Sequence, residues 1–283
     1  MSLAIVWQLM FWISGLGVVY IYAGYPLLVF VLARLRPLKT NSHYNEQPIS
    51  VVVVGFNEAA RLPGKIASIL ATDDAHLIRE VLIATDGSTD NTAQVVAEIA
   101  DPRVRLLNFP ARRGKPSVLN DTIPQCVCEF VVFTDARQEL SASALSAMTA
   151  HFADPTVGVV SGKLVLKSDG DTSTASSGIG VYWSYEKFIR QQEGQFRSVP
   201  GASGALYALR RSLFQPIPPE TILDDVVIPM QAVAAGYRCL FEPEALAFDL
   251  PSSSAMSESI RKRRTIAGAA QLIRNQQIGR AHV

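Results

Sequence analysis

An uncharged apolar segment occupies the start of the chain. No charged residue lies between Leu3 and Ala33, and the segment is rich in Leu, Ile, Val, Trp, Phe and Tyr. About 20 apolar residues suffice to cross a bilayer, so the pattern predicts a transmembrane helix. Arg34, Arg36 and Lys39 follow at once, and by the positive-inside rule they place the rest of the chain in the cytoplasm.

A secretory signal peptide is the alternative for such a segment. It would carry a charged n-region and a small-residue cleavage site, and neither precedes the basic residues here. We therefore expect a retained anchor over residues 1–36, in the inner membrane of the cell, and then a polar linker over 37–47. Pro26 is expected to kink the helix or to end a first span.

From residue 48 the pattern changes to short apolar runs separated by amphipathic segments. ISVVVVGF, EVLIAT, EFVVFT and VGVVSGKLVL are near-continuous apolar runs rich in β-branched residues, as expected for strands buried on both faces. Helical patterns stand between these runs, at residues 57–70, 92–100, 115–123 and 141–152. Alternation at this spacing predicts βαβ units and an α/β fold with a mostly parallel central sheet.

The alternation weakens beyond residue 166. We expect a polar loop at 167–177, a helix at 180–193 and a Gly-rich strand entry at 200–209. A helix that begins with two aspartates follows from 224, and two final strands lie at 239–243 and 245–249. The α/β domain is predicted over 48–256 and a basic amphipathic helix over 257–277. The tail 278–283, I-G-R-A-H-V, fits no earlier pattern, and its back-translation resembles sequencing-adapter DNA. We expect it to be non-native, with the natural chain continuing past about Gln277.

Composition narrows the range of partners. The net charge of +1 over 283 residues predicts no nucleic-acid partner. Cys126, Cys128 and Cys239 lack the spacing of a zinc site or of a disulfide framework, which favours reduced thiols in a cytosolic domain. The four histidines are scattered without ligand spacing.

Three acidic sites fall where the pattern places the ends of elements. Asp86 in TDGSTD and Asp135 in FTDAR directly follow predicted strands. Ligands of open α/β sheets bind beyond the carboxyl ends of the strands, so these two carboxylates are expected to share one pocket. The pair Asp224–Asp225 in ILDDVVIP is expected to close it from the acceptor side. Such a site suits a phosphorylated, hydroxyl-rich donor.

Six motifs occur in order along this pattern, namely FNE, TDGSTD, RGK, FTDAR, GASGALYALR and LDD. Together they resemble the family 2 inverting glycosyltransferases, enzymes of the GT-A fold that include synthases of bacterial polysaccharides. The resemblance covers about Ile49 to Gln271. It implies a GT-A fold behind a transmembrane helix, a nucleotide-sugar donor (UDP-linked) and a lipid-linked or glycan acceptor. It also implies membership of a polysaccharide-synthesis complex.

The resemblance assigns the first two motifs to the nucleoside. It places Phe56, Asn57, Glu58 and Asp86 at the uracil and ribose of the donor. A carboxylate there accepts hydrogen bonds from base N–H groups or sugar hydroxyls and so orients the donor. Asp90 is instead expected to cap the next helix.

The resemblance assigns the next two motifs to the diphosphate. Lys115 stands at a helix N-terminus, a favourable place to contact a phosphate, whereas Arg112 and Arg113 are interpreted as solvated. Asp135 matches the first carboxylate of the Asp-x-Asp motif that holds Mg²⁺ or Mn²⁺, but Arg137 stands in place of the second. Hard cations prefer several oxygen ligands, so Arg137 either binds phosphate directly or points away while Asp135 and water hold the metal.

The last two motifs are assigned to the acceptor side. Asp225 resembles the catalytic base that takes a proton from the attacking hydroxyl, with Asp224 as second choice. A pair of helix-capping aspartates is the structural alternative. The neighbouring GASG segment, with Gly201, Ser203 and Gly204, is expected to contact the acceptor.

The segment 261–265 departs from the polymerising members of that family, which carry Gln-x-x-Arg-Trp there. Only Arg264 matches, because Arg261 replaces the Gln and Thr265 replaces the Trp. The Trp lines the acceptor end of the glycan path, so its absence argues against a cellulose-like or chitin-like processive synthase. Arg264 is a candidate for the donor diphosphate, and contact of this basic helix with an anionic membrane surface is the equal alternative.

Two other functions stay open. A transferase that makes polyprenyl-phosphate sugars is close, but that group usually reads Asp-Ala-Asp where this chain has Asp135-Ala136-Arg137. It also lacks an anchor of this kind. A non-catalytic GT-A-like module that holds nucleotide or scaffolds a complex is motivated by Arg137 and by the altered 261–265 segment. The intact set of Asp86, Asp135 and Asp225 favours an enzyme.

Overall fold

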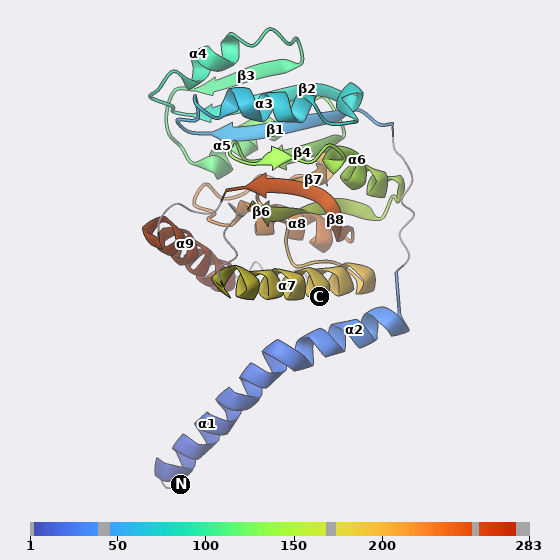
Figure 1. Ribbon diagram of the computed structural model, residues 1–283, viewed down its shortest axis with the longest axis vertical. Helices are drawn as coiled ribbons and strands as arrows, with labels where there is room; N and C mark the ends of the chain where they lie inside the picture. Colours follow the sequence, from blue (N-terminus) through green and yellow to red (C-terminus); the bar gives the residue numbers. More distant parts are fainter. Residues whose placement is uncertain (1–2, 39–45, 168–173, 251–254, 276–283) are drawn as a thin grey trace.

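The computed structural model describes residues 3–38, 46–167, 174–250 and 255–275, with side chains left undescribed at 174–183, 255, 257 and 258. An eight-stranded sheet in the order β3-β2-β1-β4-β7-β6-β8-β5 forms the centre of the chain (Figure 1). Its strands are β1 (Ile49–Gly55), β2 (Ile78–Asp86), β3 (Val104–Phe109), β4 (Phe130–Thr134), β5 (Glu139–Leu140), β6 (Val157–Leu166), β7 (Leu206–Arg210) and β8 (Arg238–Asp249).

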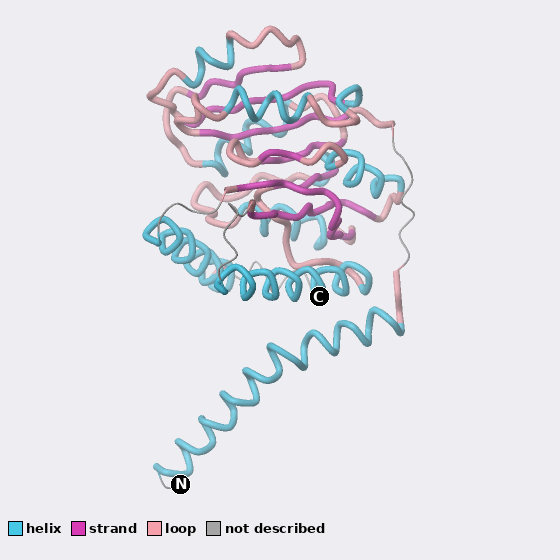
Figure 2. The backbone as a smooth tube through the Cα atoms, viewed as in Figure 1, coloured by secondary structure: helices cyan, strands magenta, loops and turns pink. Residues whose placement is uncertain are grey.

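Helices flank this sheet and precede it. Figure 2 shows helices on either face of the strands, with α7 and α9 lying beyond the sheet. The α-helices are α1 (Leu3–Val19), α2 (Tyr25–Leu35), α3 (Leu62–Leu70), α4 (Thr92–Ala97), α5 (Lys115–Thr122), α6 (Ala144–Thr149), α7 (Thr174–Phe196), α8 (Asp224–Ala234) and α9 (Ala255–Arg274).

The first four strands of the chain form a parallel block, as the alternating pattern predicts. β1 pairs in parallel with β2 and β4, and β2 pairs in parallel with β3. β7 runs antiparallel to β4 and to β6, whereas β6 and β8 are parallel and β5 is antiparallel to β8. The sheet is therefore mixed, with its parallel half carrying the N-terminal motifs.

Alternate residues of each strand feed two hydrophobic clusters. Val51 and Val53 of β1 belong to the cluster under α3 and α6, while Val52 belongs to the cluster that includes residues of α5 and α8. All three are at most 1% exposed. Since burial of a Val or Ile side chain stabilises a fold by about 1.5–3 kcal/mol, helices must cover both faces of these β-branched runs.

Three predicted boundaries were wrong. Helix α3 begins at Leu62 rather than at residue 57, because Pro63 lies in its first turn, where a missing N–H is tolerated. The two final strands are one strand, β8, with a register shift between its pairings through Phe241 and Leu246, around Pro243. Helix α7 begins at Thr174, inside the predicted polar loop.

The N-terminal apolar helix divides into an exposed part and a docked part. The helical run Leu3–Leu35 has 33 residues, with a π-helical turn at Tyr20–Gly24 before α2. Pro26 lies in the first turn of α2, so the run continues past it. Helix α2 packs on α7, where the Phe30 and Phe188 rings lie 6.0 Å apart and Tyr25 donates a hydrogen bond to Glu193.

Two predicted segments lie wholly or largely outside the described residues. These are the suspected non-native tail at 278–283 and most of the linker predicted over 37–47. The three cysteines are buried free thiols.

Candidate active site

Asp86 at the end of β2 holds the loop that leads into α5. Its Oδ1 accepts a hydrogen bond from the Arg113 backbone N–H at 2.7 Å, and its Oδ2 accepts one from Gly114 at 3.0 Å. Gly87 has φ +67, and a Cβ there would lie 2.4 Å from the backbone nitrogen of Arg112. The D-G pair therefore brings two loops into direct contact, a positioning role that the motif alone did not reveal.

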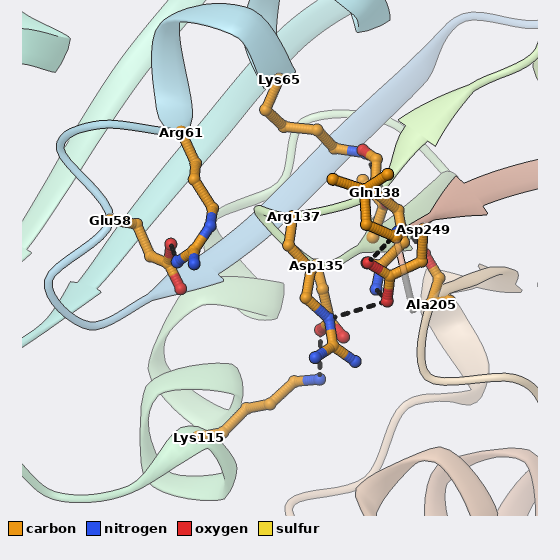
Figure 3. A network of polar contacts seen from close by, with 11 residues as sticks. Glu58, Arg61, Lys65, Lys115, Asp135, Arg137, Gln138, Ala205 and Asp249 are labelled. Carbon is orange, nitrogen blue, oxygen red and sulfur yellow. Dashed lines mark hydrogen bonds and ion pairs between the residues drawn. The ribbon is translucent and has the colours of Figure 1, made fainter. Parts of the chain in front are cut away.

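The FNE turn after β1 is locked onto the DGSTD loop. Asn57 adopts φ 56, and its side-chain Oδ1 accepts a hydrogen bond from Thr89 N–H at 2.8 Å. Glu58 pairs with Arg61 at 2.7 Å (Figure 3). The predicted nucleoside residues thus form one edge of the site together with Asp86.

Arg112, interpreted from the sequence as solvated, stacks its guanidinium 3.9 Å from the centre of the Phe56 ring. That contact joins the FNE turn to the loop before α5.

Lys115 brings together two carboxylates from different elements. It begins α5, and its Nζ lies 3.2 Å from Asp135 Oδ1 and 3.3 Å from Asp224 Oδ2. Burial alone would lower the pKa of Lys115, but Asp224 and Asp135 outweigh it and raise the pKa, so the ammonium stays charged. The cation at this point is the kind of group that a donor diphosphate would engage.

Arg137 pairs with a carboxylate at the end of β8. Its Nε lies 3.1 Å from Asp249 Oδ2, and Asp249 is 6% exposed (Figure 3). Gln138 donates to the same carboxylate at 3.0 Å. Both predicted roles of Arg137, direct phosphate contact and orientation away from the metal, stay predictions.

Lys65 braces the same turn from the opposite side, a role that sequence analysis missed. Its Nζ donates to Thr134 Oγ1 and to the Gln138 carbonyl, each at 2.7 Å, and the residue is 2% exposed. Burial lowers the pKa of Lys65 to about 7, against the charges of Asp135 and Glu139. Only long-range packing reveals the role, because a lysine in an amphipathic helix ordinarily faces solvent.

The two aspartates at the start of α8 do not cap it. The N-cap position is Leu223, with no side-chain cap hydrogen bond, and Asp224 and Asp225 occupy the first turn. Asp224 is 4% exposed. Burial and the charge of Asp224 raise the pKa of Asp225 to about 6, although Lys115 opposes the shift.

The GASG segment lies directly against this turn. Ala202 N–H donates to the Asp225 carbonyl at 2.8 Å. A Cβ at Gly204 would stand 2.8 Å from Asp225 Oδ2, and one at Gly201 would stand 3.1 Å from Val226. Glycine at both positions therefore lets the segment approach the carboxylate. Ser203 and Gly204 also line a pocket beside Asp225.

Tyr207 of β7 is a further buried polar group that sequence analysis missed. It is 1% exposed, its ring stacks on Phe133 at 4.6 Å, and its hydroxyl has no hydrogen-bond partner among the described residues. Burial, and then the charge of Asp224, raise the pKa of Tyr207. The strand alternation places Tyr207 on one face of the sheet, but only the fold places it near the aspartates.

Arg264 lies at the edge of this assembly. It is exposed on α9 and its Nη2 reaches the Ile222 carbonyl at 3.5 Å, two residues before Asp224. Gln271 binds the same loop through Ile222 N–H at 3.0 Å. Helix α9 thus supports the loop that carries the aspartate pair.

The carboxylates suit a metal only in part. Among the described residues, no group of three or more His, Cys, Asp or Glu side chains is arranged to hold a metal ion. Asp135, 36% exposed in its side chain, offers one ligand. A single carboxylate fits a cation that the substrate phosphates and water hold for the most part, as Mg²⁺ commonly is.

The family model for glycosyl transferase family 2 matches residues 50–217. The chain belongs to this family. The poly-β-1,6-N-acetyl-D-glucosamine synthase of Staphylococcus epidermidis is 23% identical over 218 residues, which are 75% of this chain and 52% of that protein. The enzyme of the same name from Staphylococcus aureus strain COL is 24% identical over 207 residues, 71% of this chain and 50% of that protein. The chain thus spans about half the length of the curated relatives it matches.

Solved structures confirm the GT-A fold of this family 2 chain. A mannosyltransferase from Pyrobaculum calidifontis, in complex with GDP-Man and Mn²⁺, is 25% identical with a TM-score of 0.73, covering 92% of this chain and 74% of that one. Staphylococcus aureus TarS 1–349 in complex with UDP-GlcNAc is 17% identical with a TM-score of 0.57, covering 74% of this chain and 60% of that one. The predictions of an α/β GT-A fold and of a glycosyltransferase are confirmed.

Proposed function

We propose that this chain is a membrane-anchored inverting glycosyltransferase that moves a sugar from a UDP-sugar to a hydroxyl of a lipid-linked or saccharide acceptor. One observation carries the proposal. Lys115 joins Asp135, at the end of a parallel strand, to Asp224, beside the pocket that Asp225 lines. A donor diphosphate at this lysine would place its anomeric carbon between the two sides of the site.

The donor side is formed by the motifs after β1, β2 and β4. Phe56, Asn57, Glu58 and Asp86 are proposed to contact the base and ribose. Lys115 and Arg264 are proposed to contact the diphosphate. The solved mannosyltransferase holds GDP-Man, whereas TarS holds UDP-GlcNAc. Both nucleotides therefore belong in the test.

The acceptor side supplies the base. The acceptor oxygen attacks the anomeric carbon, the bond from that carbon to the nucleoside diphosphate breaks, and the hydroxyl proton passes to Asp225. A carboxylate whose pKa is raised to about 6 is still ionised at neutral pH and is a stronger base than an ordinary aspartate. Asp224 is the second choice for this role. Gly201, Ser203 and Gly204 are proposed to line the acceptor.

A divalent cation, Mg²⁺ or Mn²⁺, is proposed to assist through Asp135. The mannosyltransferase complex contains Mn²⁺, and such an ion would stabilise the leaving diphosphate. Arg137 pairs with Asp249 and supplies no oxygen ligand, so Asp135 is the carboxylate that this motif offers to a cation. We therefore propose a cation bound mainly by the donor diphosphate and water.

The membrane anchor is proposed from the exposed part of the N-terminal helix. Large apolar side chains from Leu3 to Tyr22 are mostly 45–74% exposed, and 20 helical residues span about 30 Å, the thickness of a bilayer core. Helix α9 adds exposed Met256, Ile260 and Ile266 near its basic residues. We propose that the catalytic domain faces the cytoplasm at the inner membrane.

Calorimetric titration of UDP and of GDP, with and without Mn²⁺, tests the donor site. We expect Mn²⁺-enhanced UDP binding that is abolished in Asp135→Ala and kept in Asp225→Asn, with turnover of Asp225→Asn reduced by about 10² to 10⁴. GDP binding in place of UDP would change the donor assignment. No nucleotide binding in any condition would favour the non-catalytic module instead.

A further inference from the structure

The pocket beside Asp225 is lined by two lysines that the proposed donor site does not use. A pocket of about 370 Å³ opens beside Asp225 and is lined by parts of β6, α7, α8, β8 and α9. Asp86, Lys115 and Asp135 are not in its lining. It therefore lies on the acceptor side, and its volume falls in the range of small-ligand sites, about 300–1,000 Å³.

Two lysines line this pocket without an ion pair or a hydrogen bond to a described residue. Lys163 of β6 and Lys187 of α7 both line it, and neither makes an ion pair or a hydrogen bond with any residue that the structure describes. Burial and the charge of Lys187 lower the pKa of Lys163, while Glu244 opposes this. The charges of Lys163 and Lys187 repel each other, and an anion bound at both would relieve that repulsion.

The third cation of the pocket is already occupied. Arg190 donates through Nη2 to Ser161 Oγ and to the Gly201 carbonyl, each at 2.9 Å, and lies 3.8 Å from Glu186. Its guanidinium also covers the Phe241 ring at 5.0 Å. Arg190 thus fixes the GASG segment, and the two lysines remain the free cations among the described lining residues.

The described lining is poorly suited to a neutral glycan chain. Thr265 lines the pocket from α9, at the position where the sequence lacks a Trp. The face of Phe241 is used by Arg190. Sugar rings commonly stack on aromatic faces, and among the described lining side chains Phe241 is the one aromatic residue, with one face covered by Arg190. Charge is therefore the main recognition chemistry of this pocket, whose described lining holds the cations Lys163, Lys187 and Arg190 and the carboxylates Glu186 and Asp225.

The pocket also adjoins the membrane side of the domain. Helix α7 carries Lys187 and, on a neighbouring face, packs against α2 through Phe188, while Tyr185 donates to the Tyr22 carbonyl at 2.8 Å. In Figure 1, α7 lies between the sheet and the N-terminal helix. A group bound at Lys187 would therefore lie on the helix, α7, that contacts the exposed apolar segment at Tyr22.

We propose that Lys163 and Lys187 bind the phosphate of a membrane-lipid-linked acceptor, whose sugar hydroxyl then faces Asp225. This inference rests on the proposed transferase function and names the acceptor class of the same site. The lipid tail leaves the pocket along α7 toward the membrane. The lysines act by binding and are not part of the bond-making step.

Titration of farnesyl phosphate into the full chain in detergent micelles tests this proposal, with and without saturating UDP. Farnesol and a glucuronate disaccharide are the comparison ligands. The variants are Lys163→Gln with Lys187→Gln, the charge-conserving Lys163→Arg with Lys187→Arg, and Arg79→Gln as an exposed charge control away from the pocket. UDP binding and thermal unfolding report whether each variant is folded, and single Gln variants replace the double one if it is not.

We expect farnesyl phosphate to bind the double Gln variant about 100-fold more weakly, about tenfold for each charge-assisted hydrogen bond that the substitutions remove. The Arg pair and Arg79→Gln should stay close to the unchanged chain. Equal binding by the double Gln variant, or equal binding of farnesol, would overturn the proposal. Equal binding of the disaccharide would assign the lysines to an anionic saccharide and overturn the lipid. If the unchanged chain bound farnesyl phosphate through the two lysines but did not bind UDP, the proposed transferase function would be wrong and the lysine site would stand.

Discussion

Replacing Asp225 by Asn should stabilise the protein while it removes activity. Burial and Asp224 raise the pKa of Asp225 from 3.8 to about 6. At 1.36 kcal/mol for each pKa unit, the ionised carboxylate is at most about 3 kcal/mol less favourable in the fold than in the unfolded chain. The neutral amide of Asn has no charge to bury and keeps a similar shape. The proposed catalytic base is thus ionised at a cost in folding stability.

The sign of this effect with pH follows from linkage. A carboxyl whose folded pKa is raised contributes its full stability below the unfolded pKa, near 4, and loses it as the pH rises through about 6. The melting temperature of Asp225→Asn should therefore match that of the unchanged chain at pH 3.5 and exceed it by several degrees at pH 7.5. The difference between the two melting temperatures should grow as the pH rises from 3.5 to 7.5.

Two assays on the same samples check the reasoning. Scanning calorimetry over pH gives the melting temperatures, and UDP release in the presence of acceptor gives turnover, which should fall by about 10² to 10⁴. Asp73→Asn, at an exposed aspartate outside the site, is the matched control and should change neither. A lower melting temperature for Asp225→Asn at pH 7.5, or retained turnover, would refute the argument.

Three further predictions test the supports of the site. Gly87→Ala should lower stability by about 2–4 kcal/mol and weaken UDP binding, because its Cβ would lie 2.4 Å from Arg112 N at φ +67. Gly64→Ala, with open space around it, should be neutral or stabilising in denaturant titrations. Lys65→Met should become less stable relative to the unchanged chain as the pH rises from 7 to 10.5, the window in which the buried lysine becomes neutral in the fold but stays charged when unfolded. A pH-independent difference would contradict that account. Arg137→Ala should lower the melting temperature by leaving Asp249 buried without its ion pair, and Arg137→Lys should recover part of the loss. Equal melting temperatures would show that the pair adds nothing.

Local pattern was a good guide to the strands and to the motifs at their ends. The β-branched runs predicted β1, β2, β4 and β6 because a strand that is buried on both faces consists of consecutive apolar residues. Asp86 and Asp135 were expected to share a pocket because each follows a buried strand. Their strands, β2 and β4, lie on either side of β1, and Lys115 links Asp135 to Asp224. The predicted start of α3 was wrong because Pro63 lies in the first turn of the helix.

The family, the α/β core, the apolar N-terminal helix and the order of the acidic motifs can all be recognised in the amino-acid sequence. Each of these is recorded in neighbouring residues, as periodicity or as a short motif. Folding in three dimensions was needed to pair Arg137 with Asp249, to set Lys65 against the turn after β4, and to bring Tyr207, Lys163 and Lys187 near Asp225. A buried polar group takes whichever partner the packing of distant elements brings within reach, and no local pattern records that choice.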